Sequence, residues 1–325
     1  NIDVKKVFSP EHGFRGKADA GELIDDSKDT KTGLPIISLH GKNRKPTHEQ
    51  LENIDVVVFD LQDVGVRFYT YLSTMHYVME ACAENNIPLL ILDRPNPNGH
   101  IVDGPVLEKE YKSFIGMHPV PILHGMTIGE YAQMINGEKW LENEVVCDLT
   151  VIPCENYSHT TEYILPVAPS PNLPNMSAIY LYPSLCLFEG TSVSVGRGTN
   201  QPFQHFGHPH LPNKGYSFKP EPMFGSKKPK LKDEVCYGFN LKEYGFQQMK
   251  TDGKLNLNWI IWAYNNYPAN KNDFFARRSF FNLLAGNSSL LKEIESGSDE
   301  IQIRKKWQVG LSKFELIRAS YLIYK

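Results

Sequence analysis

Short apolar segments alternate with amphipathic helix patterns in the first half of this chain, and this alternation most constrains its fold. Apolar runs occupy residues 4–8, 35–39, 56–59 and 89–92. The run at 56–59 is almost entirely apolar, as in strands buried on both faces of a parallel sheet. Residues 71–86 carry apolar side chains at helical spacing. The rhythm of strand and helix predicts a mostly parallel sheet with right-handed crossovers.

The pattern changes in the middle of the chain. A proline-rich segment at residues 166–175 is typical of a bend or a domain boundary. We therefore predict a Rossmann-like α/β domain over residues 1–168, built on the mostly parallel sheet. A smaller α+β domain is expected over residues 169–325, with an active-site cleft between the two. Within the second domain, the histidine- and proline-rich residues 205–210 are expected to form a loop.

Polar side chains follow each predicted strand of the first domain. In strand order they are Glu11 and His12, then His40, then Asp60 and Asp63, then Asp93 and Arg94. In open α/β sheets, ligands bind outside the carboxyl ends of the strands. A single Asp or Asn at such a place can equally cap a helix or form a turn. Polar groups at four strand ends together favour a ligand site.

Composition and motifs exclude several classes of partner and site. The net charge of −3 over 325 residues does not favour a nucleic-acid partner. No apolar run approaches the ~20 residues of a membrane span. The chain lacks the G-x-G-x-x-G fingerprint and the P-loop, so no cofactor is expected. Its five cysteines include no C-x-x-C pair, and no metal site is predicted.

Six segments, in order along the chain, resemble the motifs of one family. They are residues 9–16 (SPEHGFRG), 60–71 (DLQDVGVRFYTY), 93–97 (DRPNP), 125–130 (GMTIGE), 169–172 (PSPN) and 189–199 (EGTSVSVGRGT). This family was long of unknown function and includes exo-β-N-acetylmuramidases of bacterial cell-wall turnover. The resemblance covers essentially the whole chain. It implies an exo-acting glycosidase that releases N-acetylmuramic acid from the non-reducing end of peptidoglycan fragments. Family members carry a further strand and helix before residue 9, so we expect the intact protein to begin upstream.

Glycoside hydrolysis needs a proton donor for the leaving oxygen and a second catalytic group. We predict Glu11 as the general acid/base, with His12 beside it, because Glu11 directly follows a predicted buried strand. A capping role is the alternative for Glu11. The second group is predicted at Asp63 or, as second choice, at Glu189. For an N-acetyl sugar, the substrate's own acetamide can also act as the nucleophile.

The substrate suggests which side chains bind it. Arginine matches a carboxylate with two parallel hydrogen bonds, so the lactyl carboxylate of N-acetylmuramic acid is assigned to arginines. The candidates are Arg67, Arg94 and Arg197. Further candidates for contacts with the sugar are Asp60, Tyr69, Asn96 and Asn172, with Tyr71 and Phe203 as stacking surfaces.

Two other functions stay open at this point. A metal-dependent hydrolase would use His12, His40, Asp60 and Asp93 as ligands. A non-catalytic protein that binds peptidoglycan fragments would keep the arginines and aromatic residues without needing an acid. The cell-wall substrate also suggests a periplasmic or secreted location. The oligomeric state is not predicted.

Overall fold

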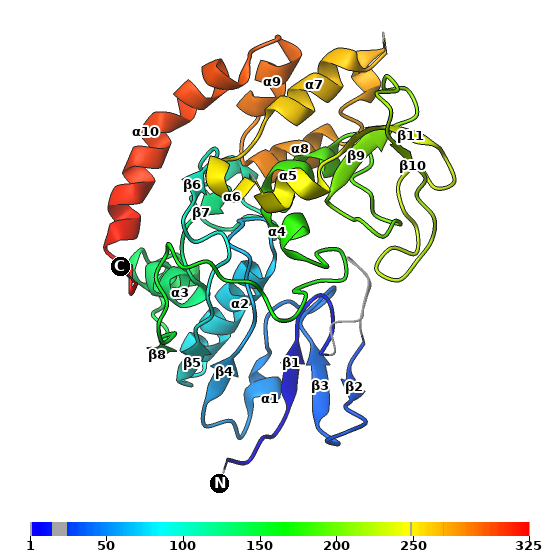
Figure 1. Ribbon diagram of the computed structural model, residues 1–325. Coiled ribbons are helices and arrows are strands. Elements are labelled where there is room, and N and C mark those ends of the chain that lie inside the picture. Colours follow the sequence, from blue (N-terminus) through cyan, green and yellow to red (C-terminus); the bar gives the residue numbers. More distant parts are fainter. Residues whose placement is uncertain (1, 15–24, 248, 269, 325) are drawn as a thin grey trace.

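The computed structural model describes residues 2–14, 25–247, 249–268 and 270–324 (Figure 1). Arg15 and Gly16, which end the first family-like motif, lie outside these residues. Within the described part of the chain, no helix combines the length and apolar character needed to cross a bilayer.

The predicted strands of the first half are present, and they pair in parallel. β1 (Val7–Ser9) pairs with β3 (Pro35–Ser38), and β4 (Val57–Phe59) pairs with β5 (Leu89–Leu92). β8 (Leu149–Ile152) continues the second sheet on the other side of β5. In the described residues these strands form two hydrogen-bonded sheets, β1–β3 and β4–β5–β8, where the sequence predicted one.

The first half departs from the prediction in a second way, because its strands are not all buried on both faces. Val57 and Phe59 of β4 are buried, whereas Val58 between them is 52% exposed. This alternation is typical of a sheet with one face toward solvent. Antiparallel pairing also occurs: β2 (Ser27–Lys28) pairs with β3, and β6 (Val102–Asp103) pairs with β7 (Leu123–His124).

Three helices accompany these strands, and their starts follow from the sequence. α1 (His48–Leu51) and α3 (Ile128–Gly137) begin at Thr47 and Thr127, each with a complete capping box. In the second box, Glu130 Oε2 accepts from the Thr127 backbone N–H at 2.9 Å, so this carboxylate has a structural role. α2 (Tyr71–Glu84) has the predicted apolar positions buried. Short 3-10 helices lie at Lys109–Tyr111 (η1) and Glu142–Glu144 (η2).

The second half consists of helices and a small antiparallel sheet that lies at one side of them (Figure 1). Its helices are α4 (Met176–Leu185), η3 (Cys186–Gly190), α5 (Lys242–Gln247), α6 (Met249–Asp252), α7 (Asn258–Asn266), η4 (Lys271–Asp273), α8 (Arg278–Ala285), α9 (Ser289–Glu295) and α10 (Glu300–Ala319). Its strands are β9 (His205–His208), β10 (Ser217–Phe218) and β11 (Cys236–Asn240), in the order β10-β11-β9. The loop predicted at 205–210 is therefore wrong for its first four residues, which pair with β11 and are buried.

Helix α10 connects the second half back to the first, as Figure 1 shows at the edge of the molecule. Its buried face includes Trp307 and Phe314, as the helical spacing predicts. Beyond its end, the Tyr324 hydroxyl donates to Asp93 Oδ2 at 2.7 Å. It also accepts a hydrogen bond from the Cys154 backbone N–H at 2.7 Å. The end of the described chain thus fixes the carboxyl ends of β5 and β8.

The apolar core crosses the predicted domain boundary. One cluster gathers strands β4 and β5 with helices α2 and α3. The larger cluster joins side chains from both halves, such as Phe68 and Tyr69 with Phe203 and Phe281. The halves share this core, and the boundary at residue 168 stays a prediction.

Arg67, predicted as a carboxylate ligand, lies in this shared region and is only 1% exposed. Its Nη1 donates to the carbonyl oxygens of Pro105 and Val120, each at 2.8 Å. Its Nη2 donates to the carbonyl oxygen of Leu284 in α8 at 2.8 Å. The guanidinium therefore ties two loops of the first half to a helix of the second, and a substrate-binding role does not fit its position.

We expect Arg67→Met to lower the free energy of unfolding by at least about 3 kcal/mol, because three buried carbonyl oxygens lose their donors. Urea denaturation followed by circular dichroism measures this. Arg94→Met is the control, since Arg94 pairs with Asp60 at the surface and such pairs contribute about 1 kcal/mol or less. Equal losses in the two variants would contradict the structural role of Arg67.

Candidate functional site

A cavity of about 210 Å³ brings together residues from both halves of the chain. The first half contributes Glu11, His12, Phe68, Tyr69, Thr70, Tyr71 and Ile115. The second half contributes Ser170, Asn172, Leu173, Tyr182, Cys186, Glu189, Arg197, Phe203, Phe280 and Leu284. Eight of the predicted site residues meet here: Glu11, His12, Tyr69, Tyr71, Asn172, Glu189, Arg197 and Phe203.

Glu11 occupies a tight turn directly after β1. The backbone N–H of Gly13 donates to the Pro10 carbonyl at 2.9 Å, and Gly13 has φ +75°. Glycine adopts this left-handed conformation at little cost. The turn aims the half-buried Glu11 side chain at the N-terminus of α2, where the Thr70 hydroxyl donates to Glu11 Oε2 at 2.9 Å.

Two histidines lie close to Glu11. His12 is buried and lines the same cavity. Burial lowers the pKa of His40, and the negative charge of Glu11 only partly opposes this. His40 is therefore mostly neutral near neutral pH. It does not line the cavity.

Glu189 and Arg197 form an ion pair in the part of the cavity wall that the second half contributes. Arg197 Nε donates to Glu189 Oε1 at 2.8 Å. Burial raises the pKa of Glu189, but the positive charges of Arg197, Lys230 and Arg277 outweigh it and lower the pKa overall. Glu189 therefore stays ionised and cannot easily donate a proton. Of the two carboxyl groups in the cavity, Glu11 is the better placed to act as an acid.

The turn that carries Arg197 depends on two glycines. Gly196 and Gly198 have φ of +79° and +82°. A Cβ atom on Gly196 would lie 1.9 Å from His205 Nε2, and one on Gly198 would lie 2.6 Å from Pro229 Cβ. The glycines thus let Arg197 reach the cavity wall.

Phe203 packs against the guanidinium of the same arginine. Its ring centroid lies 4.9 Å from the Arg197 guanidinium carbon. Phe203 has φ +55°, although its backbone N–H still donates to the Val195 carbonyl at 2.8 Å. A bulky residue rarely adopts this conformation, and such strained positions cluster at functional sites.

Tyrosines form much of the remaining wall. Tyr69 and Tyr71 pack edge to face at 4.9 Å, and Tyr182 packs on Tyr69 at 6.3 Å. The Tyr69 hydroxyl donates to the Pro169 carbonyl at 2.7 Å. Burial raises the pKa of Tyr71 to about 12, so this hydroxyl stays protonated at neutral pH. The wall offers ring faces and hydroxyl groups, which suit a sugar.

Asn172 also lines the cavity, in the proline-rich segment. Its Nδ2 donates to the Gly225 carbonyl at 2.7 Å, and its backbone N–H donates to Ser170 Oγ at 3.1 Å. The bond to Gly225 fixes the side-chain amide of Asn172, and the amide oxygen Oδ1 takes no part in that bond.

Three predicted binding residues lie elsewhere. Asp60 and Arg94 form a half-exposed ion pair at 2.7 Å beyond β4 and β5, and neither lines the cavity. Asn96 is buried. Its Nδ2 donates to the Met126 carbonyl at 2.9 Å, and its Oδ1 accepts from the Asn98 backbone N–H at 2.8 Å. Its side chain therefore connects its own loop to the segment at Met126. The structure gives these three no contact with the cavity, so a sugar-binding role does not fit them.

Asp63 is also absent from the cavity lining. Its Oδ2 accepts from the Gly65 backbone N–H at 2.6 Å and lies 3.8 Å from His124 Nε2. Burial raises the pKa of Asp63 to about 7 and lowers that of His124 to about 3. Both groups are buried inside the first half, so a catalytic role for Asp63 does not fit its position.

The cavity also contains residues that the sequence analysis missed. Thr70 lies within a motif, but only its contact with Glu11 shows its importance. Tyr182 and Phe280 lie on helices far along the chain and carry no local signal that distinguishes them from core aromatic residues.

The ligand set considered for a metal is not assembled in the described residues. These contain no group of three or more His, Cys, Asp or Glu side chains that could hold a metal ion. Asp93 Oδ1 and Oδ2 instead accept hydrogen bonds from the Gly129 N–H and the Thr127 hydroxyl, at 2.8 and 2.7 Å.

We expect Gly196→Ala to destabilise the protein by about 2–4 kcal/mol, since it combines a left-handed backbone with a collision against His205. Gly215→Ala is the matched control, because Gly215 has φ +87° but no atom within 4 Å of an added Cβ. It should cost only about 1 kcal/mol. Urea unfolding of both variants measures the difference, and equal losses would contradict the packing role of Gly196.

We expect Asp63→Asn to stabilise the protein relative to wild type, and more so at higher pH. In the unfolded chain Asp63 loses its proton near pH 4, but in the folded chain only near pH 7. Between these values the folded state binds more protons, so the contribution of Asp63 to stability falls as pH rises. Unfolding free energies of both proteins at pH 5 and pH 8 measure this. A difference that does not change with pH would contradict it.

Comparison with known proteins shows the family of this chain. Family models match almost the whole chain: exo-beta-N-acetylmuramidase NamZ, N-terminal, at residues 1–177, and the C-terminal model of the same name at residues 180–324. Peptidoglycan beta-N-acetylmuramidase NamZ from Bacillus subtilis (strain 168) is 41% identical over 347 residues, which cover 100% of this chain and 81% of that protein.

Two solved structures are similar over the whole chain. A DUF1343 family protein from Bacteroides fragilis NCTC 9343 is 48% identical with a TM-score of 0.91, and the match covers 100% of this chain and 87% of that one. A second DUF1343 family protein from the same organism is 29% identical with a TM-score of 0.79, with the same two coverages of 100% and 87%. The chain therefore belongs to the NamZ family of exo-β-N-acetylmuramidases, and it is a glycosidase.

Proposed function

We propose that this chain is an exo-acting peptidoglycan β-N-acetylmuramidase in which Glu11 is the general acid. The observation that carries the proposal is the position of Glu11 in a small cavity lined from both halves of the chain. Family membership and the Bacillus subtilis relative support the reaction class.

The size of the cavity supports exo action. Its volume of about 210 Å³ lies below the roughly 300–1,000 Å³ of pockets that enclose larger ligands. It accommodates about one sugar ring. The terminal N-acetylmuramic acid would enter it, and the rest of the fragment would remain outside. We also propose that this cavity is the active-site cleft between the two domains, because its lining comes from both halves.

The proton follows a short path in this proposal. Glu11 donates it to the glycosidic oxygen as the bond to the anomeric carbon breaks, and the Thr70 hydroxyl holds the Glu11 carboxyl in place. Positive charge then develops on the sugar ring. The ionised Glu189, which also lines the cavity, would stabilise that charge, while the substrate's acetamide remains available as the nucleophile. Once deprotonated, Glu11 would act as the base that activates water.

Arg197 would bind the lactyl group that distinguishes N-acetylmuramic acid. Its Nε is occupied by Glu189, and its terminal nitrogens remain available to the carboxylate. Phe203 and the glycine turn fix the guanidinium before the substrate arrives. Such preorganisation reduces the entropy lost on binding. Tyr69 and Tyr71 would contact the sugar ring.

We also propose that the protein acts outside the cytoplasm, because intact peptidoglycan lies there. Cell fractionation of the native host with an antibody against the protein tests this. Detection in the cytoplasmic fraction alone would contradict it.

We expect Glu11→Gln to lower the rate of cleavage of 4-nitrophenyl β-N-acetylmuramide by about 10²–10⁴-fold, the usual contribution of a general acid or base. Release of 4-nitrophenol measures the rate, and the corresponding β-N-acetylglucosaminide should be a poor substrate for the wild type. If the variant is as active as wild type, the general acid is a residue other than Glu11.

Asp60→Asn is the matched control for this variant. It also removes one carboxylate, but Asp60 pairs with Arg94 outside the cavity. Its activity should equal that of the wild type. If the folded wild type cleaves neither substrate but binds N-acetylmuramic acid, the chain is a binding protein and the proposal is wrong.

A further inference from the structure

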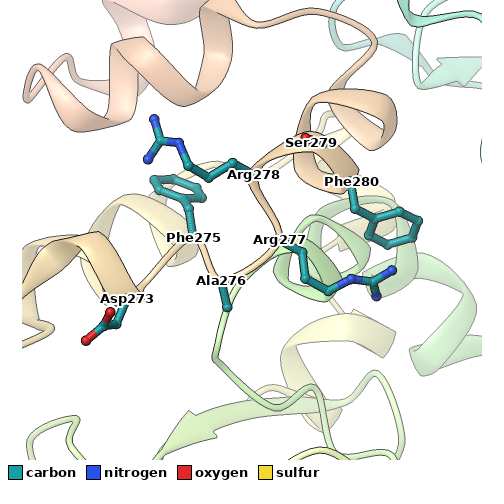
Figure 2. Close-up of a pocket in the computed structure, with 7 residues that line it drawn as sticks. All are labelled: Asp273, Phe275, Ala276, Arg277, Arg278, Ser279 and Phe280. Carbon is teal, nitrogen blue, oxygen red and sulfur yellow. The ribbon is translucent and has the colours of Figure 1, made fainter.

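Arg277 is a cation at the edge of the Glu11 cavity. It directly precedes α8, and its guanidinium carbon lies 4.1 Å from the ring centroid of Phe280. Phe280 lines the Glu11 cavity and also an open pocket of about 770 Å³ beside it. Figure 2 shows that Arg277 and Phe280 extend toward the same side of this pocket, whereas Arg278 points away from them. Arg277 therefore lies beside the residue that the cavity and the open pocket share.

The charge of Arg277 is not compensated by any ion pair within the described part of the chain. Its neighbours differ in this respect. Arg197 pairs with Glu189, and Arg278 pairs with Glu295. The ammonium group of Lys230 is bound by the protein backbone, because its Nζ donates to the Thr191 and Val193 carbonyls at 2.7 and 3.0 Å.

Arg277 is nevertheless close enough to act on the cavity. Its positive charge contributes to the lowered pKa of Glu189, after Arg197 and Lys230. At the same time its side chain is exposed, so it can receive a ligand from solvent. Stacking on Phe280 restricts the guanidinium without occupying its hydrogen-bond donors.

The substrate needs such a cation. Peptidoglycan fragments carry carboxylates on the lactyl group or on a peptide attached to it, and the ionised Glu189 would repel them. Arg197 brings little net charge, because Glu189 neutralises it. Phe280 lines both the cavity of about 210 Å³ and the open pocket, so a carboxylate that extends from the one into the other would pass its ring.

We propose that Arg277 is a specificity-determining residue, which binds a carboxylate of the substrate where the substrate leaves the cavity past Phe280. The inference rests on the proposed function. The carboxylate is that of the free lactyl group or that of an attached peptide, and both present the same chemistry to the guanidinium.

Three 4-nitrophenyl β-N-acetylmuramides test this proposal. One has a free lactyl carboxylate, one has a neutral lactyl methylamide, and one has an Ala-isoglutamine peptide on the lactyl group. Arg277→Gln should raise KM about tenfold for one or both carboxylate substrates, as expected for one charge-assisted hydrogen bond. The kcat should stay the same, and the methylamide should be unaffected.

Arg278→Gln is the matched control, since this neighbouring arginine is paired with Glu295 and should behave as wild type. A loss confined to the free lactyl substrate assigns Arg277 to the lactyl carboxylate. A loss confined to the peptide substrate assigns it to the peptide. Equal losses on all three substrates, no loss on any, or the same pattern in Arg278→Gln would overturn the proposal.

A failure of the proposed function is distinguishable from a failure of this inference. If the wild type cleaves none of the three substrates, calorimetric binding of N-acetylmuramic acid and its methylamide replaces the kinetics. Tighter binding of the acid by wild type, lost in Arg277→Gln, supports the role of Arg277 without any turnover. Equal binding of the two sugars, or no binding of either, overturns it.

Discussion

Three carbonyl oxygens surround the buried Arg67 guanidinium, and much of the molecule depends on these contacts. Two of the carbonyls belong to loops of the first half, at Pro105 and Val120, and the third belongs to Leu284 in α8. The same helix carries Phe280 into the cavity. Fixing α8 on the first half therefore also fixes one wall of the site, so the interaction that joins the halves positions the chemistry as well.

The two halves of the chain contribute different groups to the site. Glu11 comes from a turn after a short parallel strand and is held by Thr70 at the start of α2. Glu189 and Arg197 come from the second half and keep each other ionised. Positive charges from Arg197, Lys230 and Arg277 lower the pKa of the Glu189 carboxyl, so this group remains an anion. Carboxyl groups in one site can take different roles, and the proposed mechanism assigns the acid to Glu11 and the stabilising anion to Glu189.

Much of this could be predicted from the sequence, because it depends on local signals. Parallel strands, capping boxes and the turn at Glu11 follow from residue patterns within a few positions. The division into two sheets could not be predicted, since it depends on pairing between distant strands. Arg67 and Asp63 stand in the same motif as the cavity residue Tyr69, yet tertiary contacts direct their side chains elsewhere. A buried guanidinium that binds carbonyls has the same sequence signature as one that binds a substrate.

The span of the Arg67 contacts has a consequence for biosynthesis. Arg67 and Leu284 are 217 residues apart in the chain. At translation rates of 5–20 residues per second, roughly 10–40 s separate their appearance. Until α8 emerges from the ribosome, the guanidinium lacks one of its acceptors and stays hydrated, because a charged group without partners is costly to bury. We therefore expect the contacts that close the two halves around Arg67 to form only after the synthesis of α8.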